Sequence, residues 1–322
     1  MAYQPYMYTE RLVCSMRILH YLKQFIINPR IRFGYISRLG LYNHISDVDY
    51  VKKEWKVMFG TELNLEAPKS FNEKLQWLKV YDHNDTYTMM VDKYKAKTYV
   101  ASLIGKEYII PTLGVWDSFD DIDFEQLPDK FVLKCTHDSG TVIICRNKSN
   151  LNKNDIKKNI TKFLKRKYYY CHREWPYKNV QPRIIAEQFM QNGSDKELKD
   201  YKFYCFNGIP RYLYVSVGMD NHDTARISFL NIDWTFADFG RTDYRPLEQL
   251  PQKPNRYDEM IEIAKKLSKG IPFLRVDLYE INGQIYFGEL TFSPCAGMMP
   301  FDPPEADLKM GKLLDISEIM NN

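Results

Sequence analysis

Hydrophobic and polar positions alternate through much of the second half of the chain, and this alternation predicts a β-rich region. Short apolar runs rich in Val, Ile, Phe and Tyr, bounded by turn residues, have the length and composition of strands. They occupy residues 109–115, 131–134, 142–144, 184–189, 200–204 and 212–217. Residues 274–278 and 287–291 flank the turn signal Asn282-Gly283 and predict a β-hairpin.

Helical spacing of apolar residues predicts helices before and between these strands. Ser70 and Glu73 have the spacing of a capping box, which predicts that a helix starts there. Other predicted helices cover residues 88–105, 155–167 and 260–267. An amphipathic helix is predicted over residues 11–27, ending near Asn28-Pro29. Helices combined with antiparallel hairpins predict a mixed α+β protein.

The predicted hairpin carries acids on otherwise apolar strands. A buried carboxylate is unfavourable unless it is paired or bound to a metal, so Asp277 and Glu289 predict an oxygen-ligand site for Mg²⁺. With a plain two-residue turn, Asp277 would pair with Gly288 and Glu289 would face the other way. A bulge or a longer loop puts Asp277 opposite Glu289, with Arg275 on the same face. We predict that register, and a connection at Asn282-Gly283 other than a simple two-residue turn. The alternative is an exposed edge hairpin with solvated acids.

The composition is that of a folded protein with room for about two domains. The chain has 322 residues, of which 44% are hydrophobic, so it can bury sizeable cores. Its net charge of +4 is mild and gives no case for nucleic-acid binding. Six cysteines without a CxxC pair predict reduced thiols and no metal-thiolate site, and Cys295 is expected to be a buried small residue rather than a nucleophile. Oligomeric state leaves no signature in the sequence.

Positive charge is concentrated near the N-terminus, in a segment that has no acid between Glu10 and Asp47. Its basic residues are Arg11, Arg17, Lys23, Arg30, Arg32 and Arg38. Two interpretations of the helix over residues 11–27 stand: it packs onto its own domain, or it lies on an anionic membrane surface. The sequence lacks the pattern of a signal peptide and an apolar run of membrane-spanning length. We therefore expect a cytoplasmic protein, with the inner face of the cell membrane as the second location.

Candidate nucleotide chemistry comes from charged residues on strands, because neither a P-loop nor a Rossmann glycine motif occurs. Lys134 ends an apolar strand and precedes the small polar loop 136–141, where an ammonium and backbone N–H groups can hold phosphate oxygens. Lys202 shares a strand face with Asp200, which fits either a site or ordinary ion pairing. Glu187, near the exit of an apolar strand, fits either adenine binding or a solvated strand end.

The order of these residues along the chain resembles that of an ATP-grasp enzyme. The phrases SFNEKLQWL, VDKY, DYKF, RVDLY and GELTF, which begin at Ser70, Val91, Asp200, Arg275 and Gly288, are similar to those of the TupA-like ATP-grasp family, named for teichuronopeptide synthesis. The resemblance covers about residues 50–315. It implies an ATP-grasp fold, in which two α+β subdomains clamp a nucleotide behind a helical N-terminal region. The implied parts are residues 1–69 (helical), 70–130 (N-terminal α/β subdomain), 131–190 (small lid subdomain) and 191–322 (catalytic subdomain).

The resemblance also implies roles for single residues. The implied nucleotide-binding residues are Lys93, Lys134, Thr136, Ser139, Gly140, Thr141, Glu187, Gln188, Met190 and Lys202. The implied magnesium ligands are Asp277, Glu289 and Thr291, the last of which stands where many ATP-grasp enzymes have Asn. The implied catalytic residues are Arg275 and Lys202. Lys202 would lie near the γ-phosphate, and Arg275 would steady the transferring phosphoryl group.

The reaction implied by the resemblance is that of an ATP-dependent ligase. A carboxylate attacks the γ-phosphate of MgATP, and an amine then displaces phosphate from the acyl-phosphate to give an amide. The implied partners are a small-molecule or glycan carboxylate and an amine, in bacterial cell-surface polysaccharide (capsule, O-antigen or teichuronopeptide-like) biosynthesis. One alternative is a phosphotransferase acting on a sugar hydroxyl. Another is a glycosyltransferase that uses Asp121 and Asp123, and a third is a non-catalytic adaptor.

Overall fold

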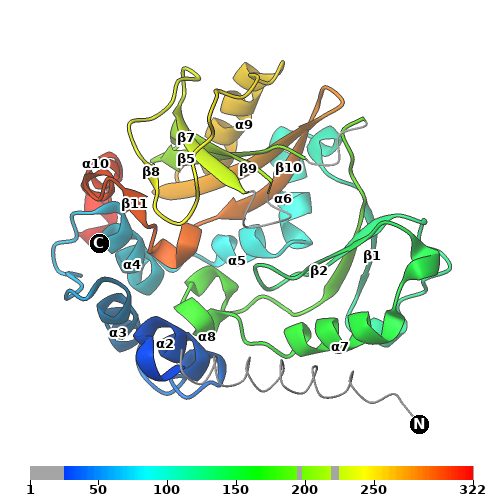
Figure 1. Ribbon diagram of the computed structural model, residues 1–322, viewed down its shortest axis with the longest axis horizontal. Coiled ribbons are helices and arrows are strands. Elements are labelled where there is room, and N and C mark those ends of the chain that lie inside the picture. Colours follow the sequence, from blue (N-terminus) through cyan, green and yellow to red (C-terminus); the bar gives the residue numbers. More distant parts are fainter. Residues whose placement is uncertain (1–24, 194–197, 219–224, 322) are drawn as a thin grey trace, which may run out of the picture. The chain divides into compact units, whose positions relative to one another are not determined.

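The computed structural model describes residues 25–193, 198–218 and 225–321, and the chain divides into two compact units (Figure 1). The first unit comprises the chain up to Leu63 together with Tyr170–Arg173, and the second comprises Asn64–Tyr169 and Glu174–Asn322. Most of the predicted helix over residues 11–27 lies outside the described residues. Its described end, residues 25–27, is helical and stops at Asn28. None of the described helices has both the length and the hydropathy needed to cross a membrane.

The first unit is built on two helices, α2 (Pro29–Arg38) and α3 (Asp47–Phe59). They confirm the helical N-terminal region that the resemblance implied, although neither helix was predicted individually. Asn28 caps α2 by accepting hydrogen bonds from two backbone N–H groups, and the fixed φ of proline suits the first position of the helix. The buried face of α2 carries Phe33 and Ser37, which pack against Tyr50 of α3. The Tyr50 hydroxyl donates at 2.5 Å to the carbonyl of Cys171, which belongs to the same unit.

The second unit holds all the described strands and the helices that follow α3, except most of the short α8 (Tyr169–His172), of which all but the first residue belongs to the first unit. Its longer helices are α4 (Phe71–Tyr81), α5 (Asp85–Val91), α6 (Lys95–Ile104), α7 (Lys153–Leu164), α9 (Tyr257–Ser268) and α10 (Glu305–Leu313), with the short α11 (Ser317–Met320) near the C-terminus. Its strands are β1 (Thr112–Trp116), β2 (Phe131–Cys135), β3 (Val142–Cys145), β4 (Ile184–Gln188), β5 (Asp200–Phe206), β6 (Ile209–Val217), β7 (Arg226–Asn231), β8 (Gly240–Arg241), β9 (Phe273–Ile281), β10 (Gln284–Thr291) and β11 (Phe301–Asp302). The capping box of Ser70 and Glu73 at the start of α4 is confirmed.

The larger sheet has five antiparallel strands in the order β10-β9-β5-β6-β7. One face is apolar: Phe203, Val276 and Leu278 join a core with Met260 and other residues of α9, and Figure 1 shows α9 beside this sheet. Because side chains alternate along a strand, Asp200, Lys202, Arg275, Asp277 and Tyr279 share the opposite face. The apolar face anchors the strands, and the charged face is left for chemistry.

The register of the hairpin β9–β10 confirms the central prediction, since Glu289 lies opposite Asp277 and Thr291 opposite Arg275. The predicted form of the connection is wrong. Ile281 pairs with Gln284 across a two-residue turn, Asn282-Gly283, in which both residues have positive φ.

The register changes at a bulge at Gly288, between Phe287 and Glu289, and not at the turn. Before the bulge Ile285 and Phe287 face the apolar core, and after it Leu290 does. The extra residue shifts the alternation by one position and turns Glu289 to the charged face. A Cβ at Gly288 would lie 3.0 Å from the carbonyl oxygen of Asp277, so the bulge depends on glycine.

The smaller sheet has four antiparallel strands in the order β1-β4-β2-β3. Phe131, Leu133 and Cys135 of β2 face a second apolar core that includes Ile160 of α7. Lys134 therefore points to the other face of the sheet, which it shares with Glu187 of β4.

A break in the predicted helix over residues 88–105 divides it into α5 and α6. The Asp92 carboxylate accepts hydrogen bonds from the N–H groups of Tyr94, at 2.9 Å, and Lys95, at 3.2 Å. A side chain that caps these N–H groups starts a new helix, which corrects the prediction of one continuous helix. The break leaves Lys93 between the two helices.

Candidate functional site

A cavity of about 200 Å³ lies in the second unit and gathers charged residues from both sheets, from α6 and from the break between α5 and α6. The charged lining residues are Lys93, Lys97, Lys134, Glu187, Asp200, Lys202, Asp277 and Glu289. The apolar lining residues are Met90, Val91, Ala96, Ile109, Ile110, Val142, Phe287 and Leu290. A cavity that joins apolar surface to opposed charges suits a ligand with a flat apolar part and a polyanionic part.

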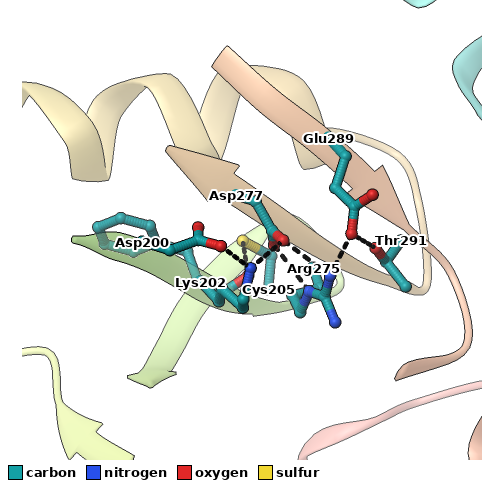
Figure 2. Close-up of polar contacts among 8 residues, drawn as sticks. Asp200, Lys202, Cys205, Arg275, Asp277, Glu289 and Thr291 are labelled. Carbon is teal, nitrogen blue, oxygen red and sulfur yellow. Dashed lines mark hydrogen bonds and ion pairs between the residues drawn. The ribbon is translucent and has the colours of Figure 1, made fainter. Parts of the chain in front are cut away.

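The five-stranded sheet contributes what we call the acid cluster, which consists of Asp200, Lys202, Arg275, Asp277 and Glu289. Figure 2 shows Asp277 between the two cations: its oxygens accept hydrogen bonds from Arg275, at 2.7 Å to each oxygen, and from Lys202, at 2.7 Å. Arg275 also donates to Glu289 at 2.6 Å, and Lys202 pairs with Asp200. Three carboxylates thus share two cations.

Two carboxylates of the acid cluster have strongly shifted pKa values. Burial raises the pKa of Glu289, but the attraction of Arg275, Lys202, Lys93 and Lys134 outweighs it and lowers the value to about 2. Burial raises the pKa of Asp200 to about 6, because the attraction of Lys202 is opposed by the nearby charge of Asp277. One Asp200 oxygen, Oδ1, is buried without a hydrogen-bond partner. The cluster keeps a surplus of negative charge at the cavity wall.

The four-stranded sheet and α6 contribute a second group, the lysine cluster, which consists of Lys93, Lys97, Lys134 and Glu187. The Glu187 carboxylate is buried between two ammonium groups, paired with Lys97 and, at 2.6 Å, with Lys134. Burial raises the pKa of Glu187, but attraction to Lys134 and Lys97 lowers it overall. Burial lowers the pKa of Lys97 despite the attraction of Glu187. Two ammonium groups, those of Lys97 and Lys134, share the Glu187 carboxylate, and Lys93 adds a third ammonium group at the cavity wall, so this side of the cavity has a surplus of positive charge.

Lys93 connects the helix break to the loop that follows β2. Its backbone N–H donates to the carbonyl of Thr136 at 3.1 Å, and its ammonium donates to the carbonyl of Asp138. Burial lowers the pKa of Lys93, and the charges of Glu289 and Asp138 oppose that shift. In the same loop, the Thr141 hydroxyl donates to the carboxylate of Asp138. The loop is thereby held against the start of α6.

The structure brings half of the residues implied by the resemblance to the cavity wall. Those that line it are Lys93, Lys134, Gly140, Glu187, Lys202, Asp277 and Glu289. Those that do not line it are Thr136, Ser139, Thr141, Gln188, Met190, Arg275 and Thr291. Arg275 and Thr291 act from behind the wall, where both donate hydrogen bonds to Glu289 Oε1. The backbone N–H of Gln188 donates to the carbonyl of Pro111 at 3.0 Å.

Sequence reasoning did not assign Lys97, Asp200 or Tyr279 to the site, although all three line the cavity. Lys97 follows Lys93 by four residues on a predicted helix, and this spacing places two side chains on one face. That signal was available in the sequence. The solvated strand end that was an alternative for Glu187 is wrong, because this side chain is buried and ion-paired.

Three further residues considered in the sequence lie away from the cavity: Cys295, Asp121 and Asp123. Cys295 is exposed rather than buried, because a short turn with left-handed φ at Cys295 and Ala296 interrupts the chain after β10. Asp121 and Asp123 are exposed, and the Asp123 carboxylate accepts a hydrogen bond from the N–H of Glu125 at 3.0 Å. The acidic pair therefore belongs to a surface loop away from the cavity.

The acid cluster fits a magnesium ion that arrives with phosphate better than a metal held by protein alone. Within the described residues, no three His, Cys, Asp or Glu side chains are arranged to hold a metal. Asp277 and Glu289 lie opposite each other, and both line the cavity. The Glu289 side chain is 40% exposed. Mg²⁺ in proteins is commonly held by one or two carboxylates plus phosphate oxygens, and these two carboxylates match that donor set.

Comparison with known proteins gives one family and several distant structures. The family model described as TupA-like ATPgrasp matches residues 73–315. A search of curated proteins finds no match. The D-alanine–D-alanine ligase of Bacillus anthracis complexed with ATP has 12% identity and a TM-score of 0.41, over 72% of this chain and 67% of that chain. The D-cycloserine synthetase DcsG has 14% identity and a TM-score of 0.39, over 70% of this chain and 69% of that chain.

A third solved structure is longer than the part that this chain matches. The ATP-grasp ligase PsnB, complexed with a minimal precursor, Mg and ADP, has 12% identity and a TM-score of 0.36. The match covers 69% of this chain but only 58% of PsnB, so this chain spans less than two thirds of that protein.

Proposed function

The chain belongs to the TupA-like ATP-grasp family, and from this premise we propose that it is an ATP-dependent carboxylate–amine ligase that uses Mg²⁺. One observation carries the proposal. A single cavity has a lysine cluster with surplus positive charge on one wall and an acid cluster with surplus negative charge on another. Positive charge on one wall would neutralise the phosphates of a triphosphate, and negative charge on the other would bind its magnesium ion.

We propose that the nucleotide lies between the two sheets. The apolar lining from Met90, Ile110 and Leu290 supports an adenine site, since a flat apolar base gains from contact with apolar side chains. Lys93 and Lys134 would neutralise phosphate oxygens. Glu187 holds Lys134 by an ion pair at 2.6 Å, so its first role in this proposal is to position lysines rather than to read the base.

Mg²⁺ would supply charge neutralisation between the phosphates, held by the carboxylates of Asp277 and Glu289. Lys202 and Arg275 would supply the remaining positive charge. Both are fixed by ion pairs to Asp277. Lys202 lines the cavity and would meet developing negative charge without first having to be ordered, whereas Arg275 would act from behind the wall by holding the two carboxylates. Asp200 lines the same cavity, and its ion pair with Lys202 helps to hold that ammonium in place.

The proposed reaction forms an amide in two transfers. A carboxylate oxygen of the substrate attacks the γ-phosphorus, and the bond to the β–γ bridging oxygen breaks, which gives an acyl-phosphate and ADP. The amine then attacks the acyl carbon, the carbon–oxygen bond to phosphate breaks, and the amine proton is lost to solvent. Positioning and charge neutralisation serve both steps without a protein nucleophile.

The substrate setting is the finer part of the proposal. From the resemblance to a family named for teichuronopeptide synthesis, we propose that the carboxylate belongs to a cell-surface polysaccharide precursor, such as a hexuronic acid, and that it is joined to an amino acid or another amine in the cytoplasm. A phosphotransferase that phosphorylates a sugar hydroxyl would use the same cavity, so the product must distinguish the two.

The test measures products from the full-length protein with MgATP, a panel of hexuronic acids and a panel of amino acids. A ligase releases inorganic phosphate only when a carboxylate and an amine are both present, and hydroxylamine in place of the amine traps the acyl-phosphate as a hydroxamate. Phosphate that stays on a sugar would overturn the ligase assignment in favour of a phosphotransferase.

Asp121→Ala serves as the matched control for Asp277→Ala. Asp121 is exposed and lies away from the cavity, so its loss leaves nucleotide binding unchanged, whereas the loss of Asp277 abolishes magnesium-dependent turnover. The opposite pattern would favour a glycosyltransferase that uses Asp121 and Asp123.

A further inference from the structure

The first unit exposes an apolar stripe along α2 that its own core does not use. Ile31, Tyr35 and Leu39 follow one another at four-residue intervals and are 43%, 57% and 64% exposed. Residues four apart lie on one face of a helix, and the opposite face of α2 carries the buried Phe33 and Ser37. Ile26, Ile27 and Leu41 are also exposed beside the ends of the helix. A monomeric protein rarely leaves so many large apolar side chains together in water.

The charged residues of α2 itself are all basic. α2 has no acid in its first turn and ends with Arg38, which is exposed. Arg30 and Arg32 lie on the same helix, and each donates a hydrogen bond to a backbone carbonyl of the first unit. In the sequence, the whole stretch between Glu10 and Asp47 contains six basic residues and no acid.

We propose that this face of α2, defined by Ile31, Tyr35, Arg38 and Leu39, docks on an anionic phospholipid bilayer. An interfacial helix needs an apolar face and basic residues, and its binding strength grows with the buried apolar area and with the attraction to anionic lipid. A partner protein or a second copy of this chain would also cover apolar residues. The acid-free basic stretch favours a surface whose charge is uniformly negative. This proposal does not depend on the ligase activity.

The test is co-sedimentation of the full-length protein with vesicles of phosphatidylcholine alone and with vesicles that contain phosphatidylglycerol. We expect binding only to the anionic vesicles, and we expect it to weaken as salt is raised. Ile31→Gln/Leu39→Gln removes apolar contact and should lower the partition coefficient by about tenfold. Arg32→Gln/Arg38→Gln should lower it by about twentyfold, because each basic residue near an anionic surface contributes to binding.

Matched controls come from exposed residues of the second unit. Leu308→Gln replaces a leucine of α10 that is 50% exposed, and Lys265→Gln/Lys266→Gln removes two charges from α9. Both should bind vesicles as the unaltered protein does, and circular dichroism and thermal unfolding check that every variant is folded. Equal binding to neutral and anionic vesicles, or unchanged binding of folded Ile31→Gln/Leu39→Gln, would overturn the proposal. A loss of self-association instead of vesicle binding in that variant would assign the stripe to a second copy.

Discussion

The lysine cluster and the acid cluster line the same cavity but carry net charges of opposite sign. In the first, one buried carboxylate, Glu187, holds Lys97 and Lys134, and a surplus of ammonium groups is left. In the second, Asp277 holds Lys202 and Arg275, and a surplus of carboxylates is left. This difference indicates that the buried ion pairs of each cluster hold the side chains in place, and that the charges left in surplus give each wall its sign. In the proposed function, the first wall would hold phosphate and the second a magnesium ion.

Asp277→Asn should produce the largest effect, because Asp277 is fully buried and holds both cations of the acid cluster. Removal of one partner from a buried ion pair leaves uncompensated charge, so we expect the free energy of unfolding to fall by about 3 kcal/mol. Urea unfolding measures it. Asp243→Asn is the control, because Asp243 pairs with Arg241 through two hydrogen bonds but is 41% exposed, and it should cost about 1 kcal/mol or less. An equal loss of unfolding free energy in the two variants would contradict the claim that Asp277 holds the acid cluster together.

Glu187→Gln should produce the second largest effect on the free energy of unfolding, because it removes the carboxylate that pairs with Lys97 and Lys134. We expect a loss of about 2 kcal/mol in the free energy of unfolding, smaller than for Asp277, because Lys134 is partly exposed and Lys97 keeps its hydrogen bond to the carbonyl of Ile110. Glu259→Gln, in a more exposed pair with Arg256, is the control. If Glu187→Gln were neutral, Glu187 would not be a scaffold residue.

Gly288→Ala tests how the acid cluster is assembled. The added Cβ would meet the Asp277 carbonyl at 3.0 Å and the Tyr279 ring at 2.9 Å, so the bulge must shift. Overpacking of this kind costs about 1.5 kcal/mol, and movement of Glu289 should weaken magnesium-dependent nucleotide binding as well. Calorimetry of unfolding and of binding would measure the two effects. Gly240→Ala, where a Cβ meets nothing within 4 Å, is the control. Normal magnesium dependence in Gly288→Ala would contradict the need for this register.

Glu289→Gln should give the smallest effect on stability, and a pH dependence identifies it. The folded-state pKa of Glu289 is about 2, below its ordinary value, so its stabilising contribution is present above about pH 4.5 and is lost as the pH falls toward 2. We expect a loss of about 1 kcal/mol at neutral pH, reduced by solvent screening because the side chain is partly exposed. The difference between Glu289→Gln and the unaltered protein should shrink between pH 4.5 and 2. A difference independent of pH would contradict the assigned pairing with Arg275.

Much of the fold and of the acid cluster could be predicted because each depended on local patterns. Alternation placed Lys134 and Lys202 on strand faces, and the cost of unpaired buried acids required Asp277 to face Glu289. The means by which the chain reaches that register could not be predicted. Either a bulge at Gly288 or a longer loop at Asn282-Gly283 would put Asp277 and Glu289 on the same face. Only the packing of Asp277 and Tyr279 against Gly288 shows which of the two the chain uses.

Other parts of the site depended on contacts between distant segments. The break at Asp92 requires a capping side chain inside a pattern that reads as one helix. The ion pair between Lys97 and Glu187 joins residues 90 positions apart, and nothing local in the sequence indicates it. The helix α2 was not predicted because Asn28-Pro29 was interpreted as the end of the preceding helix, whereas Asn28 caps α2 and Pro29 is its first residue. The helix α3 has an amphipathic pattern and an N-cap at Ser46, so its signal was present in the sequence.

The most direct test of the two-wall account is a calorimetric titration of the full-length protein with a non-hydrolysable ATP analogue, with and without Mg²⁺. The account predicts magnesium-dependent binding by the unaltered protein, loss of the magnesium dependence in Glu289→Gln, and loss of binding under both conditions in Lys134→Ala. Absent or magnesium-independent binding by the unaltered protein would contradict it.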